Sequence, residues 1–320
     1  MLQAQSNETG AGTFQFAIGE GVLFDPAFRE GPECSDHDIC RANAYRGDSL
    51  SGSFDFRLDC NREIPVATCG SDWFLVNLIN RVVDLEEDQI NRIPGTRWVM
   101  RFRNPIWIVG VSLLLSSLVI VHFLAPWCTL WRLAFHGLGC LYNWRLRPGW
   151  PRIKELYLLK NVASAFGFMI TLFGYPLASI GYESTGLASG IDWIVVSFLA
   201  AYFFLFELSY EVTYDLRDVQ GDQEAGVRTL PVVHGPEWAQ KIVLGLCATS
   251  SGLLLGGFFA GWIPWRVAVL AVGPMVHGAL IFRSRLRGVL ALDCIRWTWA
   301  GSGLLLLFHL WVFLKLPGVR

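Results

Sequence analysis

Long runs of apolar residues, separated by short polar stretches, fill the chain from about residue 64 to its end. A helix needs about 20 apolar residues to cross a lipid bilayer. Clear or probable runs of this kind lie at 105–125, 127–142, 162–182, 191–213, 242–262, 265–282 and 297–314. A weaker run at 64–83 is interrupted by polar residues, among them Asp72 and Asn77. The pattern predicts an all-α, polytopic transmembrane helical bundle of about eight spans.

Two of these runs contain residues that restrict how their helices lie. Arg132 and His136 fall in the run at 127–142, and ionisable residues inside a membrane face the interior of a bundle. Gly174 and Pro176 fall in the run at 162–182, where they predict a kink. We therefore expect the first of these helices inside the bundle and the second bent.

Residues 1–63 have a different character, because they are polar, rich in Gly and without clear periodicity. No basic segment followed by an apolar core is visible there, which argues against a signal peptide. We expect a poorly ordered N-terminal extension at 1–63 and a transmembrane domain at 64–320.

Composition supports a membrane protein. Charged residues make up 17% of the chain, hydrophobic residues 53%, and the mean hydropathy is +0.40. Soluble domains carry about 25% charged residues. The net charge of −1 argues against nucleic acid as a partner. The lipid bilayer is therefore the expected environment, and the chain is expected to be an integral, multi-pass membrane protein.

Lys and Arg are concentrated in alternate loops. They occur at 89–103, 143–160, 214–241 and 283–296, whereas the intervening turns near 125–127, 183–190 and 263–266 contain only Arg266. Loops rich in Lys and Arg remain in the cytoplasm. The pattern predicts that the four basic loops share the cytoplasmic face.

A row of carboxylates begins where the run at 191–213 ends. Asp215, Asp218 and Asp222 are spaced i, i+3 and i+7, so on a helix they share one face. Such a row repels itself unless a cation lies within it, and Mg²⁺ takes oxygen ligands of this kind and often shares them with phosphates. The sequence therefore predicts a metal site here, in preference to a solvated loop.

A second row lies at the other acidic segment, where Asn80, Asp84 and Asp88 are four residues apart. Both rows lie on the expected cytoplasmic side. Facing each other, they could hold Mg²⁺ ions and a diphosphate, which metal ions make a better leaving group by neutralising its charge. Cations are available for the remaining phosphate charge at Arg97, Lys154, Lys160 and Arg228.

Aromatic residues in the apolar interior suggest a further hypothesis. The ring faces of Tyr175, Tyr202 or Phe206 could stabilise an allylic carbocation. Packing or lipid contact is the commoner role for aromatic residues at such positions.

These segments resemble the UbiA-type intramembrane prenyltransferase family. NRVVDLEEDQIN, which begins at Asn80, resembles the first motif of the family, NxxxDxxxD. YDLRDVQGDQEAGVRTLP, from Tyr214 to Pro231, resembles the second, DxxDxxxD, including the trailing Gly-x-Arg-Thr-Leu-Pro. KELYLLKN, from Lys154 to Asn161, is similar to the basic stretch two helices before the second motif. The resemblance covers about residues 74–315.

The resemblance implies a bundle of usually nine helices around a cavity open to lipid, Mg²⁺ as cofactor, and a polyprenyl diphosphate donor. It implies transfer of the prenyl group to an aromatic or other lipophilic acceptor. By match to the motifs, the ligands of Mg²⁺ and diphosphate would be Asn80, Asp84, Asp88, Asp215, Asp218 and Asp222, and the five aspartates would also be the catalytic residues. Arg97, Lys154 and Arg228 would contact the diphosphate. The chain departs from the family at residues 1–63, where the apolar first helix of the family is not found.

Three other functions remain open. A membrane terpene cyclase would use the same ionisation with an internal alkene as nucleophile. A cation-coupled transporter would need charged or unwound helix centres near the midplane, whereas the acidic residues here cluster at one face and the middles of the helices are apolar. A truncated, inactive homologue would keep the motifs without the activity.

Overall fold

The computed structural model describes residues 56–90, 95–183, 192–285 and 287–318, and all regular elements within them are helical. Most of the expected N-terminal extension, in which the sequence shows no apolar first helix of the family, falls in residues 1–55, which lie outside the described residues. The first described helix, α3, begins at Phe56, earlier than the expected start at residue 64.

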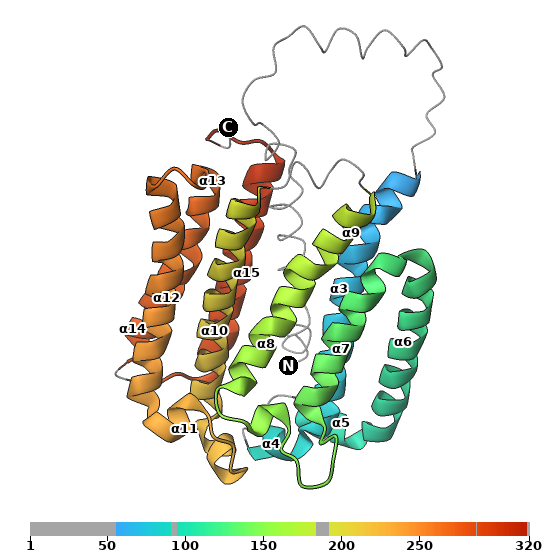
Figure 1. Cartoon of the computed structure of the whole chain (residues 1–320). Coiled ribbons are helices and arrows are strands. Elements are labelled where there is room, and N and C mark those ends of the chain that lie inside the picture. The colour runs from blue at the N-terminus through green and yellow to red at the C-terminus, as the bar shows by residue number, and fades with distance from the viewer. Residues whose placement is uncertain (1–55, 91–94, 184–191, 286, 319–320) are drawn as a thin grey trace, which may run out of the picture.

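The N-terminal half consists of α3 and the helices that pack around it (Figure 1). α3 contacts both α6 and α7, and its C-terminal end continues through a bend at Asp84 into the short α4. The 3-10 turn Pro126–Cys128 joins α6 to α7. The helices of this half are α3 (Phe56–Val83), α4 (Leu85–Ile90), α5 (Thr96–Arg101), α6 (Arg103–Leu124) and α7 (Thr129–Asn143).

The C-terminal half is arranged around α10, which packs against α8, α11, α12 and α15 (Figure 1). A π-helical segment, Ile170–Gly174, interrupts the α-helix between α8 and α9, where Gly174 and Pro176 predicted an irregularity. The helices are α8 (Leu159–Met169), α9 (Tyr175–Glu183), α10 (Trp193–Glu224), α11 (Leu230–His234), α12 (Pro236–Phe259), α13 (Trp265–Ala268), α14 (Val272–Ser284) and α15 (Ala291–Phe313).

Five helical stretches of the described chain are long and apolar enough to cross a membrane. They are Arg103–Leu124, Leu159–Ser179, Trp193–Glu224, Pro236–Phe259 and Trp265–Ser284. α3, α7 and α15 run alongside them (Figure 1). Each of the eight expected spans is therefore helical, and the predicted all-α membrane bundle is confirmed.

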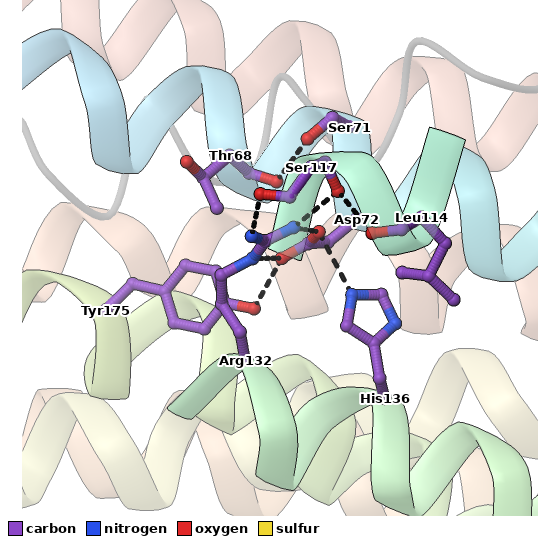
Figure 2. A network of polar contacts seen from close by, with 8 residues as sticks. All are labelled: Thr68, Ser71, Asp72, Leu114, Ser117, Arg132, His136 and Tyr175. Atoms are coloured by element: carbon purple, nitrogen blue, oxygen red, sulfur yellow. Dashed lines mark hydrogen bonds and ion pairs between the residues drawn. The ribbon is translucent and has the colours of Figure 1, made fainter. Parts of the chain in front are cut away.

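A network of buried polar side chains explains the charges that interrupt the first spans (Figure 2). Arg132 Nε on α7 donates to Asp72 Oδ2 on α3 at 2.8 Å, and both side chains are almost fully buried. The hydroxyl of Tyr175 on α9 donates to Asp72 Oδ2 at 2.7 Å, and His136 Nε2 lies 3.0 Å from Asp72 Oδ1. Arg132 also donates to the carbonyl of Ser117 on α6 at 2.8 Å. The network joins α3, α6, α7 and α9, and it places α7 inside the bundle as expected.

Candidate functional site

The first acidic motif follows one helical face across a break between two helices. Asn80 lies in the last turn of α3, Asp84 at the bend, and Asp88 on α4. The Asp84 amide donates to the Asn80 carbonyl at 2.9 Å and the Asp88 amide to the Asp84 carbonyl at 2.8 Å. Because these bonds keep the i to i−4 spacing of an α-helix, the three side chains stay on one face despite the bend.

The second acidic motif lies on the last turns of α10. The sequence placed the end of this span at residue 213, but α10 continues to Glu224, so Asp215, Asp218 and Asp222 are all helical. Asp215 and Asp222 are buried. α4 packs against α10, which brings the two motifs to the same end of the bundle (Figure 1).

Two lysines lie among these carboxylates. Lys154, in the 3-10 turn η4 (Ile153–Glu155), forms an ion pair with Asp84 of the first motif. Lys160, in the first turn of α8, lies 2.8 Å from Asp215 Oδ1 and 3.6 Å from Asp222 Oδ2 of the second. The segment between α7 and α8 therefore supplies positive charge to both motifs, and both lysines were expected here from the sequence.

The start of α8 holds a further polar contact to the second motif. Asn161 Nδ2 donates to Asp215 Oδ2 at 2.8 Å, and both residues are buried. Leu158, just before α8, has φ = 62°, a backbone conformation that non-glycine residues rarely adopt. Strained backbone of this kind clusters at functional sites. Asn161 was not predicted as a site residue, because its contact joins residues 54 positions apart.

Two arginines on the motif helices add charge pairs that the sequence did not predict. Arg81 Nη1 lies 3.1 Å from Asp88 Oδ2. Arg217 donates two hydrogen bonds to its neighbour Asp218, at 2.8 and 2.6 Å. Arg81 and Arg217 immediately follow or precede motif positions, but nothing in the spacing alone showed that they fold back onto the carboxylates.

The carboxylates still repel one another. Burial raises the pKa of Asp88, and the nearby carboxylates of Asp84 and Asp218 raise it further, against the opposing effect of Arg81. Asp88 is on α4 and Asp218 on α10, and these two helices pack against each other. Unfavourable negative charge is therefore gathered where the two motifs meet.

The donor set fits a divalent cation that prefers oxygen ligands. It consists of five carboxylates and the side-chain oxygen of Asn80, which is buried without a hydrogen-bond partner. The described residues contain no preassembled cluster of three or more His, Cys, Asp or Glu side chains of the kind that holds a metal. Their carboxylates are turned toward lysine and arginine, so metal binding would require those ion pairs to rearrange. The assignment of the six motif residues as ligands stays a prediction.

The structure does not bring two of the expected phosphate contacts to the carboxylates. Arg97 is exposed on α5. Arg228 is also exposed, and its guanidinium lies over the ring of Tyr157 at 5.8 Å from the ring centre. Their predicted contact with a diphosphate therefore rests on the motif match and not on a contact with the acidic rows.

The three aromatic residues suggested for carbocation stabilisation are engaged in packing. Tyr175 is fully buried, with its hydroxyl bonded to Asp72. Tyr202 donates to the carbonyl of Leu270 at 2.8 Å, and Phe206 packs beside it in the main hydrophobic core. Packing is the role that these contacts support.

Three polar residues near the acidic motifs were not singled out from the sequence. Glu207 and Glu211 lie on α10, within the run whose middle was described as apolar, so that description was wrong for this helix. Tyr142, at the end of α7, lies within electrostatic range of Asp84, Lys160 and Glu211. Spacing could have identified the two glutamates. Glu207 and Glu211 precede Asp215 by eight and four residues, which places all three on one face of a helix.

An all-helical membrane bundle that brings two acidic motifs and two lysines together at one end defines a class of intramembrane enzyme. Residues 73–291 match the UbiA prenyltransferase family, and the chain belongs to this family. The resemblance inferred from the motifs is therefore confirmed.

Several named proteins are similar in sequence to part of this chain. Digeranylgeranylglyceryl phosphate synthase from Pyrococcus abyssi is 29% identical over 52% of this chain, and the match spans about half of that relative, 54% of its length. The synthase of the same name from Methanothermobacter thermautotrophicus is 28% identical over 72% of this chain and 76% of its own.

The fold is also that of a solved membrane protein. The structure of a UbiA homologue from Archaeoglobus fulgidus bound to DMAPP and Mg²⁺ superposes with a TM-score of 0.60 at 16% identity. The alignment covers 96% of this chain and 97% of that homologue. The architecture is thus shared although few residues are identical.

Proposed function

We propose that this enzyme transfers a prenyl group from a polyprenyl diphosphate to a lipophilic acceptor within the membrane, with Mg²⁺ as cofactor. The observation that supports it most is that the two acidic motifs lie at one end of the bundle, where α4 packs against α10, beside Lys154 and Lys160. The solved homologue that binds DMAPP and Mg²⁺ supports the same donor class and the same metal.

Each group of site residues would have a separate role. Asn80, Asp84, Asp88, Asp215, Asp218 and Asp222 would hold Mg²⁺, which supplies charge neutralisation for the departing diphosphate. Lys154 and Lys160 would bind phosphate oxygens, since their amino groups already lie among the carboxylates. Asn161 holds the carboxylate of Asp215 in place through its hydrogen bond. The prenyl chain would extend from this end into the apolar interior, and the acceptor would capture its first carbon.

We also propose that the end carrying both motifs faces the cytoplasm. The basic loops at 89–103, 143–160, 214–241 and 283–296 support this orientation through the positive-inside bias. A donor made in the cytoplasm would then reach the carboxylates without its diphosphate crossing the bilayer.

The test is transfer from a labelled prenyl diphosphate in membranes that contain the Asp84→Ala variant. With Mg²⁺ present, activity should fall by about 100-fold or more, as it does when a charge-stabilising group is removed from a reaction centre. Glu86→Ala is the matched control, because Glu86 lies on the same short helix, α4, and is exposed. Undiminished transfer by Asp84→Ala would contradict the site.

The acceptor requires a separate panel. Because the relatives are named for a glyceryl phosphate product, a glyceryl phosphate ether belongs in the panel beside aromatic acceptors. Mass spectrometry would identify the product of each reaction. A cyclised product formed without any acceptor would contradict the transferase proposal and favour terpene cyclase chemistry.

A further inference from the structure

Two glutamates extend the acidic row of α10 toward the middle of the membrane. At about 100° per residue, the positions of the row fall within an arc of about 80° on one helix face. The residues of this arc are Glu207, Glu211, Asp215, Asp218 and Asp222. Glu211 precedes Asp215 by one turn, about 6 Å along the axis, and Glu207 precedes it by two. Both glutamates are half-buried, so their carboxylates are not sealed in the core.

A contact from another helix shows which way Glu211 faces. Ser164 Oγ on α8 donates to Glu211 Oε1 at 2.7 Å. Glu211 therefore faces α8, the helix whose first turn also brings Lys160 and Asn161 to Asp215 of the second acidic motif.

Packing does not account for these two carboxylates. Asp72, the buried carboxylate of the N-terminal half, is neutralised by Arg132 and bonded to Tyr175. By contrast, Ser164 is a neutral donor, and no hydrogen bond or ion pair of Glu207 is present in the described part of the chain. A carboxylate within a membrane span is costly, and such residues mark functional sites.

Their position suits the acceptor rather than the diphosphate. Lys154 and Lys160 attract phosphate at the end of α10, whereas an anionic phosphate beside Glu207 and Glu211 would be repelled. A donor held with its diphosphate at that end has its first carbon next to the headgroup, within reach of the Glu211 turn. A carboxylate there can accept a hydrogen bond from a hydroxyl but cannot bind a second anion.

Given the proposed prenyl transfer, we propose that Glu211 is the general base for an acceptor hydroxyl. The bond between the first prenyl carbon and the diphosphate oxygen breaks, and its electron pair leaves with diphosphate. A lone pair of the acceptor oxygen forms the new carbon–oxygen bond. The hydroxyl proton passes to the carboxylate of Glu211. The acceptor class is therefore an alcohol, and the product is an ether.

Glu211→Gln tests this assignment, because glutamine keeps the size and one hydrogen-bond acceptor but cannot take the proton. The full chain would be placed in lipid nanodiscs with geranylgeranyl diphosphate, Mg²⁺ and a glycerol-based lipid alcohol. We expect kcat to fall by about 100-fold or more, the usual contribution of a general base. Binding of a non-reactive prenyl thiodiphosphate with Mg²⁺, measured as thermal stabilisation, should be unchanged. Glu224→Gln, exposed on the same helix, is the matched control.

Each other result has a defined meaning. An unchanged kcat, or a loss of donor analogue binding together with activity, would overturn the assignment of Glu211 as a base. If Glu211→Gln did not fold, Ser164→Ala would replace it, with a several-fold fall in kcat expected and no change overturning the proposal. A wild-type enzyme that neither binds the donor analogue nor turns over would instead refute the proposed function. A wild-type enzyme that binds the donor but uses only aromatic acceptors would refute the alcohol assignment alone.

Discussion

The amino groups of Lys154 and Lys160 separate carboxylates that would otherwise repel one another. Each amino group has two possible partners, the carboxylate that it contacts here and the phosphate oxygens of a donor. When a metal ion and a diphosphate bind together, the lysine–carboxylate ion pairs would be replaced by metal–carboxylate and lysine–phosphate pairs of similar number. The charge of the site can therefore stay nearly balanced in both states.

Lys160→Met should weaken donor binding. Lys160 contacts both Asp215 and Asp222, and a hydrogen bond to a charged group contributes about 1.5–3 kcal/mol, or about 10–100-fold in affinity. The measurement is the affinity for a prenyl thiodiphosphate in the presence of Mg²⁺. Lys241→Met is the control, since Lys241 is an exposed lysine on α12. An equal effect of both variants would argue against the role of Lys160.

Gly174→Ala should destabilise the fold. A Cβ at Gly174 would lie 2.5 Å from Trp131 Cε3, closer than such atoms approach, so the indole ring or the π-helical segment must shift. Overpacking of this kind costs about 1–3 kcal/mol. Unfolding in detergent would measure it against Gly137→Ala on α7, where a Cβ meets no atom within 4 Å. Equal stability of the two variants would show that Trp131 moves freely.

Among the helices, α3 depends on its partners more than the others do. Its span is weakly apolar, and Asp72 is buried in its middle. The bonds to Arg132 and Tyr175 tie it to α7 and α9 and position the end that carries Asn80 and Asp84. The position of the first acidic motif therefore depends on an ionic network about two turns earlier on the same helix.

Arg132→Met should unfold the N-terminal half at a lower temperature or denaturant concentration. Removing one partner leaves Asp72 buried without its cation, which costs about 3–5 kcal/mol. The double variant Asp72→Asn/Arg132→Met should regain part of that loss, because no uncompensated charge remains. Arg145→Met, at an exposed ion pair with Glu155, should have little effect. A double variant less stable than Arg132→Met would contradict the explanation.

At this scale the sequence predicted which segments are helices but not how they contact one another. The length of the apolar runs predicted the eight spans, because a chain that crosses a bilayer must satisfy its backbone hydrogen bonds within a helix or a closed barrel. α10 extends beyond the predicted apolar span, because the hydropathy signal stops at residue 213 although the helix continues to Glu224. The spacing of Asp215, Asp218 and Asp222 identified a common face. The pairing of Asp72 with Arg132 and the contact of Asn161 with Asp215 depend on tertiary packing, which no local pattern encodes.

For the whole molecule, the distribution of charge sets the orientation in the bilayer. The turns at the two ends of the bundle differ in Lys and Arg content, and both acidic motifs lie at the basic end. Donor, metal ion and diphosphate product would then all exchange with one aqueous compartment, while the prenyl chain stays in lipid.

Labelling of single cysteines should report this orientation. Gln223 lies at the motif end of α10 and Trp262 follows α12 at the opposite end, and both are exposed. In a background without the native cysteines, a membrane-impermeant maleimide added to intact cells should label Trp262→Cys and not Gln223→Cys. Permeabilised cells should label both. The reverse pattern in intact cells would place the acidic motifs outside the cytoplasm.

The ion pair of Asp72 and Arg132 also constrains how the protein is made. The two residues are 60 positions apart, so the ribosome completes α3 well before α7 emerges. Either residue alone at the centre of a helix opposes insertion by about 2.5–3.5 kcal/mol. α3 therefore gains a stable place in the lipid only when α7 arrives with its guanidinium group. We therefore expect truncation of the chain before α7 to reduce the membrane insertion of α3.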